Sequence, residues 1–221
     1  MITRVFLGAR RSDMTTEACL AHWRGKHAAI GARLPGVRAY VQNHGVLANG
    51  RFLLPYPGFD IMPELDWDDL AAMDTAMDSS AHDQEAVDDE SNFIDATRTG
   101  YTVTTRRVVA DTPPPDGAVK LITFLRRGAN ASQEDLTEAL TGPYADAVAL
   151  GDPHRHEVLV SLPDREGRPA FAFQAIDMLW FGDERDALAW VGSERAAAAA
   201  WLVAGLAFGT ERLIARPHKI V

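Results

Sequence analysis

One histidine lies among apolar residues in a segment that Thr15 or Thr16 caps as a helix. This residue is His27. On a helical wheel, with 100° per residue, His27 falls inside a single apolar arc of roughly 100°. The apolar members of the arc are Leu20, Trp23, Ile30 and Leu34. An imidazole in apolar surroundings is desolvated, which favours its neutral form and leaves it able to accept a proton. His27 is therefore a candidate general base; a core histidine bonded to a backbone carbonyl is the alternative.

Two carboxylates are candidates to assist this base. Asp60 and Glu64 share one face of a strand predicted over residues 59–65. An acid beside His27 would orient and activate the imidazole, or return the proton to the substrate. The alternative is that both carboxylates are solvated.

Other side chains that could bind a metal indicate a site less clearly. His154 and His156 alternate along a predicted strand, which would suit a metal, but no third ligand stands at a usable spacing. Between residues 52 and 97 the chain has acidic side chains and no Lys or Arg, yet it lacks the spacing of a calcium loop. We interpret that stretch as a solvated helix face. We expect no metal and no cofactor, and the two histidines could instead line a cavity.

Composition limits the possible partners and locations. The chain has 221 residues, of which 47% are hydrophobic and 24% charged, as in globular proteins. Its net charge of −9 argues against a nucleic-acid partner. Its longest apolar run, residues 196–208, is shorter than the roughly 18 residues of a membrane span, so we expect no membrane partner. The start lacks the features of a secretory signal, and Cys19 has no second cysteine to pair with, which predicts a cytoplasmic protein.

A proline-rich segment divides the chain into two similar halves. Three consecutive prolines within residues 111–117 predict a stiff linker between a domain over 1–110 and one over 118–221. Each half has the order β-α-β-β-α-β, which is the ferredoxin-like pattern and predicts an α+β fold. The expected strands cover residues 2–8, 37–47, 59–65, 101–110, 119–126, 154–162, 171–181 and 212–220. The expected helices cover residues 15–33, 67–94, 132–150 and 184–206.

The first half resembles a known family. The run from Thr16 to His27, with an aromatic-Arg-x-x-His ending, is followed by Leu34-Pro-Gly36 and then by Tyr40. Together with Phe59-Asp60, Glu64 and the block from Phe93 to Tyr101, this order is similar to that of the EthD family, named for ethyl tert-butyl ether degradation. The resemblance covers most of residues 1–110. It implies an α+β barrel in which two ferredoxin-like sheets enclose a mostly apolar cavity.

The barrel implied by the resemblance suggests further substrate contacts. In such a barrel the strand face away from the helices looks into the cavity, so Tyr40 and His44 could bond a substrate; exposure at the rim is the alternative. Trp23 would contact the substrate one turn before His27. In the second half Pro143 or Tyr144 stands where His27 would be, and Pro143 should kink the helix. That half is therefore divergent, and its cavity differs or is lost.

These expectations combine into one main hypothesis of function. A cofactor-independent lyase or isomerase would act on a small hydrophobic, aromatic or polyketide-like substrate, as in secondary metabolism or xenobiotic degradation. His27 would be the base, and Tyr40, His44 or Asp60 would stabilise or reprotonate the enolate. The alternative is a non-catalytic binding or oxygenase-accessory protein, and the resemblance also extends to distant haem enzymes. The chain would be a pseudo-dimeric monomer or a homodimer.

Overall fold

The computed structural model describes residues 1–163, 173–208 and 211–221. In the first half the elements are β1 (Ile2–Arg10), α1 (Thr16–His22), the π-helical turn η1 (Trp23–His27), α2 (Ala28–Gly31), β2 (Ala39–Gly45), β3 (Leu47–Ala48), β4 (Arg51–Phe52), β5 (Pro63–Trp67), α3 (Leu70–Met77), the π-helical η2 (Ala81–Ala86), α4 (Val87–Glu90) and β6 (Ile94–Asp111). In the second half they are β7 (Val119–Arg127), α5 (Gln133–Thr141), α6 (Pro143–Ala149), β8 (Arg155–Ser161), β9 (Ala175–Phe181), α7 (Glu184–Val191), α8 (Glu194–Trp201), β10 (Ala207–Phe208) and β11 (Arg212–Lys219).

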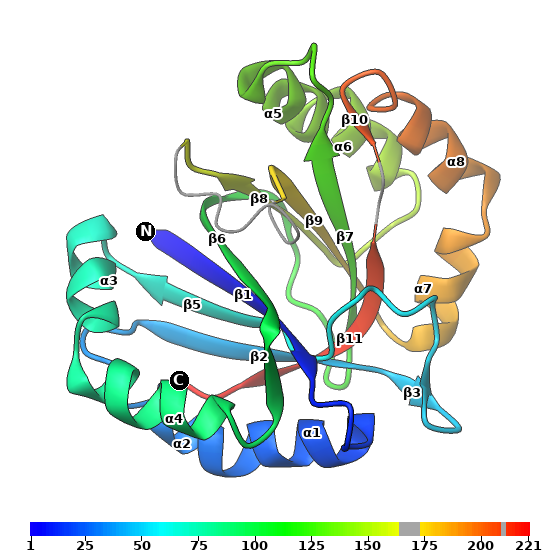
Figure 1. Cartoon of the computed structure of the whole chain (residues 1–221). Helices are drawn as coiled ribbons and strands as arrows, with labels where there is room; N and C mark the ends of the chain where they lie inside the picture. The colour runs from blue at the N-terminus through cyan, green and yellow to red at the C-terminus, as the bar shows by residue number, and fades with distance from the viewer. Residues whose placement is uncertain (164–172, 209–210) are drawn as a thin grey trace.

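The main sheet closes on itself as a barrel. Its strand order is β7-β11-β2-β5-β1-β6-β8-β9, and a further pairing of β7 with β9 completes the ring. Within each half the fourth, first, third and second long strands are neighbours, which is the ferredoxin-like order. Figure 1 shows the helices of the two halves outside the barrel, on opposite sides. The predicted α+β fold is confirmed.

Two seams join the halves. In one, β2 pairs with β11, so that Val41 lies opposite Lys219. In the other, the end of the 18-residue strand β6 pairs with β8, so that Thr104 lies opposite Ser161. Because β6 also pairs with β1 along its first part, β6 is hydrogen-bonded to strands of both halves.

The barrel interior is filled by side chains from both halves. Its apolar members include Val5, Leu7, Ile122, Phe124 and Ile176, all 1% exposed or less. The interior therefore contains a shared core, and the cavities described below lie outside it, between sheet and helices. The expectation that the strand faces turned away from the helices would enclose the substrate cavity is wrong.

Local signals explain most helix boundaries. Thr15 caps α1 by accepting a hydrogen bond from the backbone of Ala18. Ser132 forms a capping box with Asp135 at the start of α5. The second-half helix breaks at Gly142, and α6 starts at Pro143, as the proline predicts.

Two predicted strands begin later than expected. The strand over 59–65 becomes β5 at Pro63–Trp67, preceded by a bridge between Ile61 and Gly8. The strand over 171–181 is found as β9, and its expected residues 171–172 lie outside the described part of the chain.

Candidate functional site

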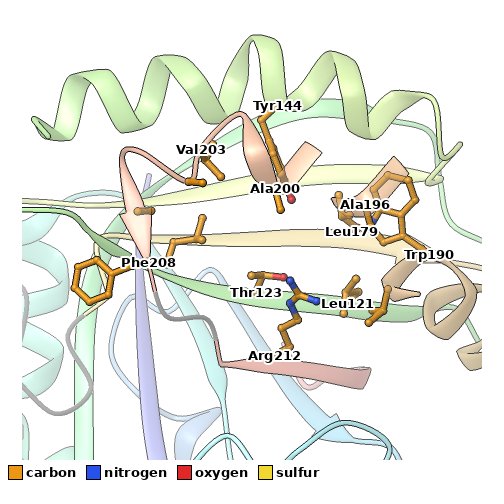
Figure 2. Close-up of a pocket in the computed structure, with 14 residues that line it drawn as sticks. Leu121, Thr123, Tyr144, Leu179, Trp190, Ala196, Ala200, Val203, Phe208 and Arg212 are labelled. Atoms are coloured by element: carbon orange, nitrogen blue, oxygen red, sulfur yellow. The ribbon is translucent and has the colours of Figure 1, made fainter. Parts of the chain in front are cut away.

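Each half has a cavity between the outer face of its sheet and its helices. In the first half the cavity has a volume of about 40 Å³, and its polar lining residues are Arg4, His27, Tyr40, His82 and Glu90. In the second half the volume is about 200 Å³, and the lining is mostly apolar (Figure 2).

A π-helical turn presents His27 to the first cavity. Residues 23–27 form η1, between α1 and α2 in one continuous helical segment. Such a turn inserts an extra residue into a helix and is frequent at functional sites. His27 is 8% exposed, and its ring contacts Phe93 edge to face, with ring centroids 5.1 Å apart. The helix thus places a buried imidazole against the sheet.

The carboxylate of Asp89 binds this imidazole from the opposite helical segment. Its Oδ2 lies 3.2 Å from His27 Nδ1 and 3.0 Å from His22 Nε2, and its Oδ1 lies 2.7 Å from Lys26 Nζ. Burial disfavours the ionised carboxylate, but the bonds from Lys26 and His22 outweigh burial and lower the pKa of Asp89 to about 2. Asp89 is therefore a carboxylate at neutral pH.

This contact determines the form of His27. Because an ionised carboxylate only accepts hydrogen bonds, Nδ1 must carry the proton and Nε2 keeps its lone pair. In the described residues no hydrogen bond occupies Nε2. Burial lowers the pKa of His27 below its ordinary value, and Asp89 opposes that shift only in part. The site therefore holds a neutral imidazole whose free nitrogen can accept a proton.

Three polar groups surround the histidine in the cavity. Burial raises the pKa of Glu90 to about 7, although the charge of Arg4 opposes the shift. Burial lowers the pKa of Arg4, and its guanidinium lies over the ring of Tyr101, 4.7 Å from the centroid. Burial raises the pKa of Tyr40 to about 12, so its hydroxyl stays protonated. A base, a cation, a titratable acid and a hydroxyl donor thus meet at one cavity.

The predicted site residues on β2 lie beneath the helix and not inside the barrel. Tyr40 lines the cavity, and its hydroxyl accepts a 2.8 Å hydrogen bond from Gln42. Trp23 also lines it and stacks on His44, with ring centroids 4.7 Å apart. His44 does not line the cavity; its Nε2 lies 2.9 Å from Gln42 Oε1, and burial lowers its pKa to about 3. Thus Tyr40 and Trp23 accompany His27, and His44 supports Trp23 from behind.

The structure does not place Asp60 beside His27. Its carboxylate accepts hydrogen bonds from the backbone N–H of Arg10 at 2.9 Å, from Thr16 Oγ1 at 3.2 Å and from Tyr56 Oη at 2.7 Å. Asp60 precedes β5 and connects the end of β1 to the start of α1. It acts as a structural anchor, and the expected contact with the base is replaced by that of Asp89.

Glu64 is also separated from the histidine. Its carboxylate points into the barrel, where Lys120 Nζ and Arg106 Nη2 pair with it and Asn43 donates a 2.8 Å hydrogen bond. Burial disfavours the ionised form, but the charges of Lys120 and Arg106 hold the pKa of Glu64 well below its usual range. Successive residues of a strand face opposite sides, so Glu64 looks inward while Leu65 looks toward the helices.

A hydrogen-bonded tyrosine lines the second-half cavity. Tyr144 lines the larger cavity, and its hydroxyl donates a 2.7 Å hydrogen bond to Asp177 Oδ2. His156 Nε2 lies 2.7 Å from Asp177 Oδ1, and both residues are buried. His154 precedes β8 and borders a different surface hollow. The two histidines are therefore not a pair, and no group of metal-binding side chains occurs within the described residues.

Sequence reasoning missed Asp89, Arg4 and Glu90. Asp89 belongs to the acidic stretch interpreted as solvated, but it is 3% exposed. The available signal is its proximity to an apolar residue: Asp89 lies in α4, four residues before the buried Phe93, which follows the helix in a turn. Arg4 alternates with the inward-facing Val5 in β1, which places it on the helix side of the sheet.

At its volume in this structure, neither cavity holds a haem group. A cavity of about 150 Å³ holds one benzene, whereas the volume beside His27 is about 40 Å³. The larger cavity, of about 200 Å³, offers as a possible axial ligand the hydroxyl of Tyr144, which is already bonded to Asp177.

Comparison with known proteins identifies the first half and the overall fold. Residues 11–97, within the first half of the chain, match the family model described as EthD domain. No curated protein matches the sequence. Within the described part of the chain, no helix combines the length and apolarity needed to cross a membrane.

Solved structures resemble the whole chain. An anthrone oxidase-like protein has a TM-score of 0.70 at 11% identity, covering 99% of this chain and 93% of its own. A monooxygenase candidate from Lactobacillus acidophilus NCFM has a TM-score of 0.56 at 11% identity, covering 100% and 94%. A mutant chlorite dismutase from Candidatus Nitrospira defluvii has a TM-score of 0.56 at 8% identity, covering 99% and 92%. At these identities the likeness shows the fold alone.

Proposed function

We propose that the EthD domain in this chain removes a proton from a small aromatic or polyketide-like carbonyl or phenol, with His27 as general base. The observation that carries the proposal is the Asp89–His27 contact of 3.2 Å, which leaves Nε2 free at a cavity. The reaction class that follows is a lyase or an isomerase, because both begin with an enolate or phenolate.

The cavity residues have distinct roles in this step. Nε2 of His27 takes the proton, and the ionised Asp89 stabilises the imidazolium that forms. Negative charge then develops on the substrate oxygen, where the guanidinium of Arg4 and the hydroxyl of Tyr40 stabilise it. Glu90, with a pKa of about 7, returns a proton to carbon or to the leaving group. The product is the rearranged or eliminated molecule, and His27 is regenerated by solvent.

The size of the cavity determines how a substrate enters. About 40 Å³ accommodates a carbonyl or hydroxyl group and not a complete ring. The roof of the cavity is formed by His82, Ala86 and Glu90 of η2 and α4. The ring of the substrate therefore has to displace this roof outward, and only the reacting oxygen and the adjoining C–H or O–H group reach Arg4 and His27.

The name of one structural neighbour agrees with the proposed substrate class, and the reaction stays open. Anthrone is a polycyclic aromatic ketone, and its deprotonation is the kind of step that His27 would catalyse. Because one chain closes the barrel, we further propose that it acts as a pseudo-dimeric monomer. An oxygenase-accessory or binding protein is the competing function, for which His27 would need only to accept a hydrogen bond.

The test follows deuterium from solvent into substrate. The purified protein is incubated in D2O with a panel of phenols, β-keto compounds and an anthrone, and NMR measures exchange at acidic carbons together with any product. We expect exchange that falls about 100-fold or more in His27→Gln. His154→Gln, outside the cavity, is the matched control and should exchange like the wild type.

Two results contradict the proposal. Equal exchange by His27→Gln and the wild type removes His27 from the mechanism. Tight binding in native mass spectrometry, with neither exchange nor product for any bound compound, supports the binding function instead.

A further inference from the structure

A cation lies at the floor of the second-half cavity, and it has no counter-ion among the described residues. Arg212 begins β11, directly opposite Thr123 of β7, and both line the cavity. Figure 2 shows the guanidinium of Arg212 beside the Thr123 side chain at the sheet. No ion pair or hydrogen bond joins Arg212 to another side chain within the described residues. A guanidinium stays charged in proteins, so the cavity has a permanent positive charge.

The nearby acids already have partners. Asp177 accepts hydrogen bonds from Tyr144 Oη and His156 Nε2, each at 2.7 Å. Glu211 Oε1 pairs with Arg126 Nη2 at 3.3 Å, whereas its buried Oε2 has no hydrogen-bond partner among the described residues. Within the described residues neither Asp177 nor Glu211 forms an ion pair or hydrogen bond with Arg212, so its guanidinium can bind an anion that enters the cavity.

The remaining walls select an apolar molecule of limited size. Leu121 and Leu179 form the floor, and Trp190, Ala200 and Val203 contribute from the helical side. The volume of about 200 Å³ exceeds the roughly 150 Å³ that hold a benzene, so one ring with a small substituent fits. The lining is therefore complementary to a single aromatic ring with one anionic group.

We propose that the second-half cavity binds a small aromatic carboxylate, with the carboxylate on Arg212 and Thr123 and the ring between Leu121 and Trp190. A guanidinium binds a carboxylate through two parallel hydrogen bonds, and the Thr123 hydroxyl adds a third. The site is for recognition and not for turnover, because Tyr144 remains protonated and donates to Asp177. This inference does not depend on the function proposed for the first half.

Fluorobenzoate is a suitable probe, with fluorobenzyl alcohol as its neutral counterpart. Titration followed by ¹⁹F NMR should give a Kd of about 1 mM or below for fluorobenzoate and binding at least tenfold weaker for the alcohol. Arg212→Gln should weaken carboxylate binding about 10- to 100-fold and remove the preference. Arg107→Gln, an exposed arginine outside both cavities, is its control.

A second pair of variants locates the bound ring. Ala200→Leu fills the cavity and should abolish binding, whereas Ala197→Leu, exposed on the same helix, should leave it unchanged. Both are informative even where Arg212→Gln does not fold, which circular dichroism would show. His27→Gln should bind fluorobenzoate normally, which separates this site from the catalytic proposal.

Three outcomes overturn the inference: no binding to the wild type, equal affinity for acid and alcohol, or an unchanged preference in folded Arg212→Gln. Loss of binding in His27→Gln would also overturn it, because the ligand would then occupy the first cavity.

Discussion

Asp89 Oδ2 lies 3.2 Å from His27 Nδ1, although 62 residues separate the two in sequence. The same oxygen contacts His22, and the other oxygen contacts Lys26, so three side chains of one helical segment converge on a single carboxylate. This convergence fixes the tautomer of His27 and attaches the first helical segment to the segment that covers it. Orientation of the base and docking of the cover therefore depend on the same group.

Asp89→Asn should lower kcat about 100-fold or more while leaving KM nearly unchanged. The amide can donate to Nδ1 of His27, which would move the imidazole proton to Nε2 and remove the base. Since Asp89 raises the pKa of His27 against burial, the variant should also shift the acidic limb of the pH profile to lower pH. Steady-state kinetics across pH would reveal both effects. A variant with normal kcat and an unshifted profile would show that Asp89 only holds the helices together.

The pH dependence of kcat/KM should be bell-shaped. Activity rises along a limb below pH 6.5, because His27 must be neutral and burial lowers its pKa from that value. Activity falls as the pH passes about 7, because Glu90 must be protonated to donate. Glu90→Gln should remove the alkaline limb, and its persistence would assign that limb to another group.

Glu90 also has a predicted effect on stability. Its pKa is raised on folding from 4.5 to about 7, so its stabilising contribution is present below pH 4.5 and is lost as the pH rises through 7. The denaturant concentration at which Glu90→Gln unfolds should therefore change less between pH 5 and pH 8 than the corresponding concentration for the wild type. Parallel urea titrations at both pH values would measure the difference. Identical pH dependence in both proteins would contradict the burial of this carboxyl.

Gly31→Ala should damage the cavity, while Gly25→Ala should not. A Cβ at Gly31 would lie 2.7 Å from a ring carbon of Tyr40, so the ring would have to move. We expect a loss of about 1–3 kcal/mol in unfolding free energy and a lower kcat. A Cβ at Gly25 meets nothing within 4 Å, and an alanine there should stabilise the helix by about 0.5–1 kcal/mol. Equal stability of the two variants would show that Tyr40 is free to move.

Lys120→Met should destabilise the barrel by about 3 kcal/mol. The substitution leaves Glu64 buried without its main counter-ion, and an uncompensated buried charge is costly. Adding Glu64→Gln should restore most of the loss. Arg38→Met breaks the exposed pair with Asp68 and is the control, with an expected loss under about 1 kcal/mol. Guanidinium unfolding would measure the wild type, these variants and the single variant Glu64→Gln, and an additive double variant would show that the pair does not interact.

The fold could be predicted from local sequence signals, whereas the site could be predicted only in part. The linker prolines, the cap at Thr15 and the alternation along the strands were sufficient for a repeated β-α-β-β-α-β order. His27 was found because its spacing matches a helical stripe. Asp89 was not found, because its partner comes from a contact that spans 62 residues. Alternation placed Tyr40 and His44 on one face but did not say on which side of the sheet the helices pack.

Closure of the barrel has a consequence for how quickly the chain folds. The seam between β2 and β11 pairs Val41 with Lys219, so it forms only after almost the entire chain has been brought together. Loop-closure entropy opposes such contacts until others hold them in place, and folds rich in them are slow to reach the native state. We expect the contacts within each half to form first and this seam to be rate-limiting. Until it closes, the edges of β2 and β11 remain open to pairing with other chains.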